Sequence, residues 1–180
     1  CPRGPARAIL SQMGLYARYI FPRLMERALD RPEIHALRGR ALAQASPPLL
    51  ELGFGTGLNL EAYPEAISEI TAIDDHAPCL GFVRRRMERA RVKVRFETGD
   101  VARLPVDDGA YATVVSTWLL CSVRDPRAVL SEVRRVLRPN GLYLFVEHGL
   151  SKEPAQRRHQ ERLTPMTRIT ACGCTLTRPI

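Results

Sequence analysis

The feature that most constrains the fold is a short apolar run that leads straight into three alternate glycines. Leu49-Leu50-Glu51-Leu52 is followed by Gly53-Phe54-Gly55-Thr56-Gly57. Glycine adopts backbone conformations closed to other residues and lets a ligand approach the main chain closely. Such a loop, placed after a strand and opening a helix, predicts a site for an anionic or polar group. The alternative is a tight strand-to-helix turn that binds nothing.

Four more short apolar runs follow along the chain, and helix-like stretches separate them. Short, nearly continuous apolar strands that alternate with helices predict a parallel sheet covered on both faces. Right-handed crossovers then make the fold a doubly wound α/β layer. The expected strands are 49–52, 70–73, 92–96, 112–116 and 142–146, and the expected helices are 57–67, 78–90 and 126–137, the last ended by a turn at Pro139-Asn140-Gly141.

Residues 1–46 have a different pattern. Their apolar side chains recur at helical spacing among arginines, which predicts one or two amphipathic helices. We expect these helices to form a cap over the ligand site. The pattern ends at Ser46-Pro47-Pro48. We expect the ligand-binding domain to span 47–150 and a basic cap segment with a truncated C-terminus to span 151–180. The apolar residues of the first segment are Leu15, Tyr19, Ile20, Leu24, Met25 and Leu29.

The composition excludes several classes of protein. Hydrophobic residues make up 45% and charged residues 26% of the 180 residues, the balance of a globular domain rather than of a disordered or coiled-coil chain. No apolar run approaches the roughly 20 residues that span a bilayer. The net charge of +8 comes with no nucleic-acid-binding motif, so nucleic acid is not the expected partner. Five cysteines, an odd number, predict reduced thiols and a cytoplasmic location.

Polar residues follow several of the expected strands, where doubly wound sheets bind their ligands. Asp74 ends the second strand and is expected to accept hydrogen bonds from ribose hydroxyls, with a lesser role for Asp75. Asp100, after the third strand, can accept from the exocyclic amine of a purine while the backbone beside it, at Val101, donates to the ring. The alternatives are a helix cap for the first acid and a turn aspartate for Asp100.

The glycine spacing separates two kinds of ligand. A dinucleotide fingerprint would be G-x-G-x-x-G. Here the third glycine comes one position early, giving E-x-G-x-G-x-G from Glu51 to Gly57. This tighter loop suits a carboxylate and amine tail better than a pyrophosphate, which disfavours a nicotinamide-dependent oxidoreductase.

Taken together, these segments resemble the class I S-adenosylmethionine-dependent methyltransferases. The resemblance covers about residues 47–150, and two segments narrow it to a small-molecule branch. Val115–Val123 and Val146-Glu147-His148 look like the methyltransferase-like thiol methyltransferases, with quinone and phospholipid methyltransferases as more distant relatives. The matching motifs are Leu50–Gly57, Ala72-Ile73-Asp74, Gly99–Pro105 and Val136–Gly141.

The resemblance implies a role for each matching residue and S-adenosylmethionine as the cofactor. The glycine loop would hold the methionine portion, Asp74 the ribose, and Asp100 the adenine amine. It also implies a Rossmann-like methyltransferase fold, here apparently without the C-terminal antiparallel strand pair. Phe54 stands where the family commonly has a small residue and is expected to crowd the methionine tail. The cofactor-binding residues expected are Glu51, Gly53, Gly55, Thr56, Gly57, Asp74, Asp75, Asp100, Val101, Thr117 and Trp118.

Catalysis needs little beyond alignment, since the methyl group of a sulfonium is already activated. His148 is the expected general base, against the alternative of a histidine bonded to the backbone, and Glu147 would orient it or a substrate amine. Cys121 is expected in the core. Cys172-x-Cys174 with His159 lacks a second ligand pair, so no metal site is expected.

The expected function is methyl transfer from S-adenosylmethionine to a small molecule. The alternative is a truncated or inactive domain that binds the cofactor weakly or serves in interactions. An RNA methyltransferase would need an acceptor loop after the fourth strand, and Thr117-Trp118-Leu119-Leu120 is not one. The basic stretch Pro154–Arg168 suggests peripheral contact with an acidic substrate or a lipid surface. The sequence leaves the acceptor atom and the oligomeric state open.

Overall fold

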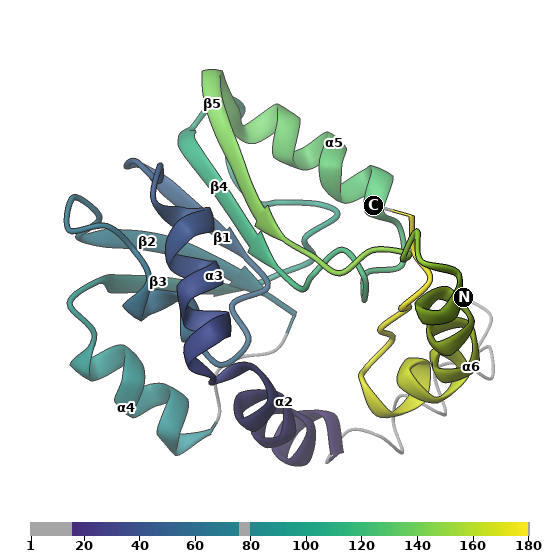
Figure 1. Ribbon diagram of the computed structural model, residues 1–180. Helices are drawn as coiled ribbons and strands as arrows, with labels where there is room; N and C mark the ends of the chain where they lie inside the picture. The colour runs from purple at the N-terminus through teal and green to yellow at the C-terminus, as the bar shows by residue number, and fades with distance from the viewer. Residues whose placement is uncertain (1–15, 76–79, 180) are drawn as a thin grey trace, which may run out of the picture.

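The protein folds around a parallel sheet with helices on both faces (Figure 1). The structure is a computed structural model and describes residues 16–75 and 80–179. Within these residues the sheet has five strands in the order β3-β2-β1-β4-β5, all paired in parallel. This confirms the doubly wound α/β fold, and no antiparallel pair is present in the described part. The strands are β1 (Leu49–Leu52), β2 (Glu69–Asp74), β3 (Lys93–Thr98), β4 (Tyr111–Thr117) and β5 (Leu137–Val146).

The sheet buries both of its faces because successive side chains of a strand point to opposite sides. On one face Leu49 and Val115 pack with Leu42 of α3 (Pro32–Leu42) and Val83 of α4 (Gly81–Arg89). On the other face the strands pack against α5 (Pro126–Val136). The second cluster includes Leu50, Leu52, Val114, Val129 and Val133.

The order of the strands reverses between β1 and β4, which lie side by side. At such a switch point the connections from the two strands leave on opposite faces and open a crevice at the carboxyl ends. The glycine loop follows β1, and Thr117 ends β4. The topology therefore places the predicted ligand loop at the crevice.

Two details differ from the expected elements. The helix expected over 57–67 is a single 3-10 turn, η2 (Leu58–Glu61), because Pro64 follows shortly and the segment turns back toward β2. β5 begins at Leu137 instead of after the turn, and its pairing jumps from Tyr111↔Leu137 to Thr113↔Leu142. Pro139-Asn140-Gly141 thus forms an irregularity within the strand, with Asn140 at φ 63°.

The N-terminal segment is helical, as its pattern predicts. It contains η1 (Tyr16–Ile20) and α2 (Phe21–Leu29) before α3, while Leu15 lies outside the described residues. Arg86 of α4 pairs with Glu26 of α2 at 2.5 Å and donates to the Thr56 carbonyl at 2.7 Å. Arg86 therefore joins α2 to the glycine loop.

The segment after β5 forms a long helix, α6 (Pro154–Thr170), which lies apart from the sheet (Figure 1). The last described residues run back from it toward the loop after β4. Arg178 donates to the carbonyl oxygens of Leu120 and Val123, the latter at 2.7 Å. Among the described helices none is long and apolar enough to cross a membrane.

Candidate functional site

The glycine loop has the backbone that its sequence predicts. Gly53, Gly55 and Gly57 all have positive φ, between 56° and 77°. A Cβ built on Gly55 would meet no atom within 4 Å, whereas one on Gly53 would come within 2.9 Å of the Leu119 side chain. The loop therefore packs closely against the segment after β4 on one side and leaves its main chain accessible at Gly55.

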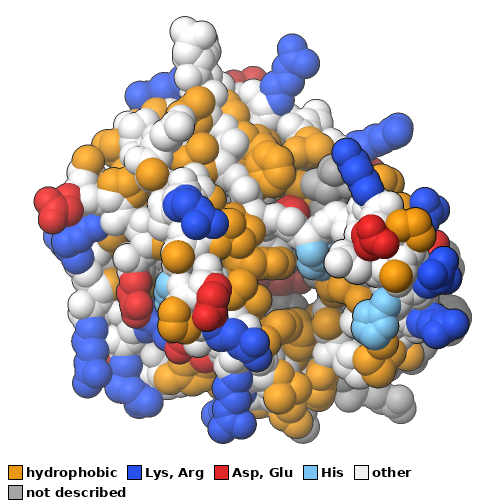
Figure 2. All heavy atoms as spheres, viewed as in Figure 1, with side chains coloured by type: hydrophobic (Ala, Val, Ile, Leu, Met, Phe, Trp, Pro, Cys, Tyr) orange, Lys and Arg blue, Asp and Glu red, His pale blue; other side chains and the backbone are white. Residues whose placement is uncertain are grey.

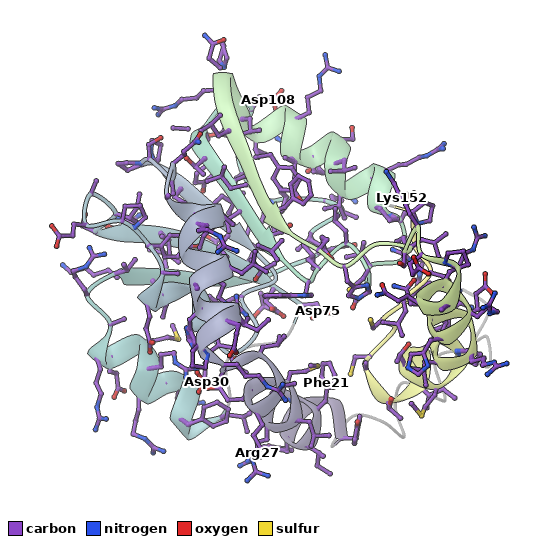
Figure 3. All side chains as sticks on the ribbon, in the orientation of Figure 1. Phe21, Arg27, Asp30, Asp75, Asp108 and Lys152 are labelled. Atoms are coloured by element: carbon purple, nitrogen blue, oxygen red, sulfur yellow. The ribbon has the colours of Figure 1, made fainter. Side chains whose placement is uncertain are left out.

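Asp74 faces this loop from the end of the neighbouring strand. The amide of Gly55 donates to Asp74 Oδ2 at 2.9 Å. The predicted ribose-binding carboxylate and the predicted methionine-binding loop are thus brought together. Asp75 follows at the same edge of the sheet and is exposed (Figure 3).

Asp100 lies one strand further along the edge and is exposed. Its Oδ1 accepts a hydrogen bond from the Ala102 amide at 2.8 Å, the geometry of an aspartate at a turn. Val101 is half-buried and packs on the core cluster beneath α5. Asp100 thus has the geometry of the turn aspartate that the sequence analysis gave as its alternative. Its carboxylate still lies at the carboxyl edge of the sheet.

Glu51 is the centre of a buried polar network. Its side chain is 1% exposed, and its two oxygens accept from Asn59 Nδ2 at 2.8 Å and from the Tyr63 hydroxyl at 2.7 Å. Burial raises the pKa of Glu51 to about 7, although these hydrogen bonds and the charge of Arg38 act in the opposite direction. Glu51 therefore supports the loop from below rather than presenting its oxygens to the crevice.

Arg38 joins this network to the loop after β4. It is buried, and it donates to Asn59 Oδ1 and to Thr117 Oγ1, the latter at 3.1 Å. Its guanidinium lies 4.5 Å from the centre of the Trp118 ring. Trp118 has φ 52°, and its amide donates to the Val146 carbonyl at 2.7 Å. Thr117 and Trp118 are thus held between α3 and the end of β5.

The ring of Phe54 does not reach the ligand side of the loop. Phe54 is 3% exposed and packs edge-on against Phe96, with ring centroids 5.8 Å apart. The expectation that it crowds the methionine tail is wrong. The positive φ values of the flanking glycines let the Phe54 side chain turn into the core.

Glu147 holds the loop after β4 in place. Its Oε1 accepts from the Leu119 amide at 2.6 Å and from the Leu120 amide. Its Oε2 is buried and has no hydrogen-bond partner among the described residues. Burial raises the pKa of Glu147 despite these bonds. These contacts make Glu147 a support for the loop after β4.

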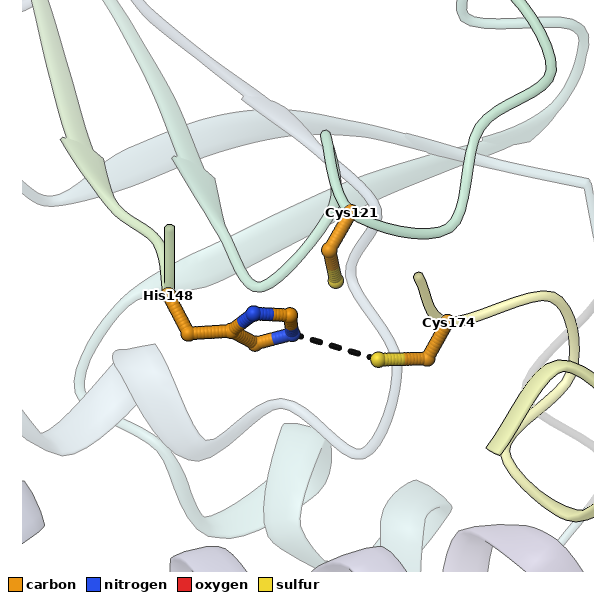
Figure 4. Close-up of side chains that lie close together, drawn as sticks. All are labelled: Cys121, His148 and Cys174. Carbon is orange, nitrogen blue, oxygen red and sulfur yellow. Dashed lines mark hydrogen bonds between the residues drawn. The ribbon is translucent and has the colours of Figure 1, made fainter. Parts of the chain in front are cut away.

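His148 lies in a cluster with two cysteines that are distant in the sequence (Figure 4). Its Nε2 is 3.1 Å from Cys174 Sγ, and the donor atoms of Cys121, His148 and Cys174 all lie within 4.8 Å of one another. Cys121 is buried, as expected of a core residue. His159, which the sequence places near Cys174, is instead exposed on α6.

The residues described above lie on a side of the molecule that has a depression. The space-filling view shows a depression lined mainly by hydrophobic side chains between the body of the sheet and α6 (Figure 2). The glycine loop and Asp74 lie at the β1–β2 side of the carboxyl edge, whereas the cysteine–histidine cluster follows β4 and β5. The site thus has two chemically different ends.

Sequence reasoning did not identify several residues of this site. Asn59 and Tyr63 follow the glycine loop at positions expected to be helical, and Arg38 lies among many other arginines. A polar residue inside an otherwise buried segment is the signal that could have indicated Asn59. Nothing local indicates Arg38, because its partners come from other parts of the chain.

Comparisons with known proteins agree with this arrangement. The chain matches the family described as "Methyltransferase domain" over residues 50–145. It is 36% identical to human thiol S-methyltransferase TMT1B over 147 residues, which cover 79% of this chain and 59% of that protein. It is 33% identical to a demethylmenaquinone methyltransferase of Thermus thermophilus over 111 residues, which cover 59% of this chain and 50% of that protein.

A solved structure agrees at the level of the fold. The YcgJ protein of Bacillus subtilis superposes with a TM-score of 0.65 at 20% identity, covering 81% of this chain and 62% of that one. The family match extends from within β1 to within β5 and so includes the glycine loop, Asp74 and Asp100. Because it covers more than half of the chain, the protein belongs to the methyltransferase domain family.

Proposed function

We propose that this chain binds S-adenosylmethionine and transfers its methyl group to a small-molecule thiol. The observation that carries the proposal is the pairing of the Gly55 amide with the Asp74 carboxylate beside an accessible stretch of main chain. The choice of a thiol is supported by the name of the human relative, thiol S-methyltransferase.

The residues present fit this cofactor. The space next to Gly55 lets a ligand approach the loop amides, which suit a carboxylate. Asp74 would accept from ribose hydroxyls, with Asp75 beside it, and Asp100 with the Val101 backbone would face the adenine. The predicted loop residues Gly53, Thr56 and Gly57 shape this end, and Glu51 supports it from the core.

S-adenosylmethionine supplies a methyl carbon that its sulfonium makes electrophilic. The chain has to align the acceptor and exclude water, which is catalysis by proximity. Thr117 and Trp118 border the crevice and are fixed by Arg38. Glu147 is proposed to position the loop after β4, and His148 to act at the acceptor end.

The test is a methyl-transfer screen over thiols, amines, phenols and quinols. The reaction is measured as the release of S-adenosylhomocysteine. We expect turnover with thiols and little with the other classes. Calorimetric titration of the same protein with S-adenosylmethionine distinguishes a methyltransferase from an interaction domain. Folded protein that binds no cofactor would support an interaction domain and contradict the proposal.

We also propose that α6 makes reversible contact with an anionic membrane surface. Met166 and Ile169 are 54% and 63% exposed, and Arg162 is exposed on the same helix. Exposed apolar side chains among arginines are suited to an anionic lipid interface. Salt-sensitive co-sedimentation with phosphatidylserine vesicles, reduced in a Met166→Ser, Ile169→Ser variant, is the expected result; equal sedimentation with neutral vesicles would contradict it.

A further inference from the structure

Three metal-binding side chains from separate segments converge beside the loop after β4. Cys121 comes from that loop, His148 from just after β5, and Cys174 from the stretch after α6 (Figure 4). Their donor atoms lie within 4.8 Å of one another, with His148 Nε2 at 3.1 Å from Cys174 Sγ. The side chains point toward a common centre although their residues span 54 positions of the chain, from 121 to 174.

The convergence is fixed by the backbone on all three sides. The Thr175 amide donates to the Cys121 carbonyl at 2.9 Å, which holds the segment of Cys174 against the loop. Trp118 and Glu147 join the same loop to the end of β5, directly before His148. The three donors therefore belong to one rigid corner of the molecule and do not meet through long, freely rotating side chains.

The spacing suits a zinc ion. Zinc binds thiolate sulfur at about 2.3 Å and imidazole nitrogen at about 2.0–2.1 Å in a tetrahedral arrangement, which places donor atoms roughly 3.5–3.8 Å apart. The distance from His148 Nε2 to Cys174 Sγ is 3.1 Å, and no two of the three donor atoms are more than 4.8 Å apart, so the donor separations span this range. Cys121 and Cys174 would each release a proton to solvent on binding zinc, and their two thiolates then balance the charge of the ion until the acceptor binds.

One polar atom at this corner has no partner within residues 16–75 and 80–179. His148 Nδ1 is buried and has no hydrogen bond among the described residues. Buried polar atoms are usually satisfied by protein or by a bound molecule. Nε2 is therefore the ring atom that faces Cys174, and within the described residues Nδ1 has none of the hydrogen bonds that usually orient a metal-bound imidazole.

We propose that Cys121, His148 and Cys174 bind a zinc ion and that the acceptor thiol occupies its fourth position. This rests on the proposed function, because the thiol is the acceptor named there. Among the described residues, the group of close donors contains these three alone. Zinc sites with three protein ligands hold water or substrate in the fourth position.

On binding, the acceptor thiol gives up its proton to solvent and coordinates through sulfur as a thiolate. No electron is transferred, since zinc has no redox chemistry. A thiolate is the nucleophilic form of sulfur, so the metal keeps the acceptor in its reactive state at neutral pH. His148 then acts as a metal ligand in place of the general base expected from sequence.

The test begins with zinc content. The full chain is equilibrated with zinc chloride, freed of loose metal by gel filtration and analysed by mass spectrometry. We expect one zinc per chain in the wild type and in Cys172→Ser, whose cysteine lies two residues from Cys174 and outside the cluster. Cys174→Ser and His148→Ala should lower the zinc content at least tenfold. Wild-type protein without stoichiometric zinc would overturn the proposal, as would equal loss in the Cys172→Ser control.

Cobalt(II) substitution tests the fourth position. The cobalt protein should show the visible bands of tetrahedral coordination and thiolate charge transfer, and 2-mercaptoethanol should intensify the charge-transfer band while ethanol leaves it unchanged. An unchanged spectrum with the thiol would overturn the proposal. Calorimetry with S-adenosylmethionine on the same samples separates the two ideas: cofactor binding and thiol methylation without zinc would refute the metal site alone.

Discussion

The guanidinium of Arg38 lies 4.5 Å from the centre of the Trp118 ring and joins the N-terminal helices to the loop after β4. The same side chain donates to Thr117 and Asn59, so one arginine of α3 contacts both sides of the crevice. A cation over an indole ring is a favourable pair, and more so when both are shielded from water. The N-terminal segment is thereby part of the site and not an appendage to the sheet.

Arg38→Lys should loosen this junction. Lysine keeps the positive charge near Glu51. It lacks the planar guanidinium that stacks on Trp118 and donates to two acceptors at once. We expect a loss of about 1–2 kcal/mol in the free energy of unfolding and a shift in the emission of Trp118, the single tryptophan of the chain. Arg40→Lys, on the exposed side of the same helix, is the control and should change neither. Identical behaviour of the two variants in urea unfolding would contradict the assignment.

Asp74→Asn should weaken cofactor binding much more than folding. Asparagine can still accept from the Gly55 amide, so the loop keeps its shape, but the charge-assisted bonds expected with the ribose are lost. We expect the dissociation constant for S-adenosylmethionine in calorimetry to rise about tenfold to a hundredfold. Asp107→Asn, in the loop at the opposite end of the sheet, serves as the control. Unchanged affinity of the Asp74 variant would show that the carboxylate does not touch the ligand.

Gly55→Ala and Gly109→Ala form a matched pair. Both glycines have positive φ, 56° and 61°, and at both an added methyl group meets no atom within 4 Å. Each substitution should therefore lower the unfolding free energy by a similar amount, about 1–2 kcal/mol. The methyl group at Gly55 enters the space assigned to the cofactor, so that variant alone should lose binding. Equal affinities measured by calorimetry would place the ligand elsewhere.

The buried carboxyl of Glu51 should make stability depend on pH. Its pKa is raised from 4.5 to about 7 in the folded state, so the folded protein holds a proton that the unfolded chain releases above pH 4.5. The resulting stabilisation is complete below pH 4.5 and decreases as the pH rises to 7, by about 3 kcal/mol in total. Urea unfolding at pH 5, 6 and 7.5 should show this decrease in the wild type.

Glu51→Gln supplies the comparison for that measurement. Glutamine does not titrate, so the variant should lack the part of the decrease that belongs to Glu51. Its Oε1 can still accept from Asn59, which limits the structural change. Parallel stability curves for the two proteins would mean that Glu51 is ionised throughout this pH range.

Much of the fold could be predicted because its determinants are local. The apolar runs around Leu50, Ile73 and Val114 indicate burial on both faces of the sheet. Asp125 caps α5, where its Oδ1 accepts from the Arg127 amide at 2.9 Å. The helix predicted over 57–67 is wrong for a physical reason. Its apolar residues fit helical spacing, but they are buried by packing under the sheet and extend for one 3-10 turn only.

The site was less predictable because its contacts are long-range. The glycine loop and Asp74 could be identified from their places after two strands, and the structure brings them together. The meeting of Cys121 with Cys174 depends on how the chain returns after α6, which no spacing in the sequence encodes. The roles of the individual site residues, the division into domains and the cytoplasmic location remain predictions.

The hydrogen bonds from Arg178 to Leu120 and Val123 affect where this protein can be truncated for experiments. A fragment trimmed at residue 145, where the family match ends, would retain nearly all of the five strands together with the glycine loop. It would discard His148, Cys174 and the clamp that presses the terminal segment onto the body. Such a minimal domain would keep its fold but lack the C-terminal segment that we expect to help choose the acceptor.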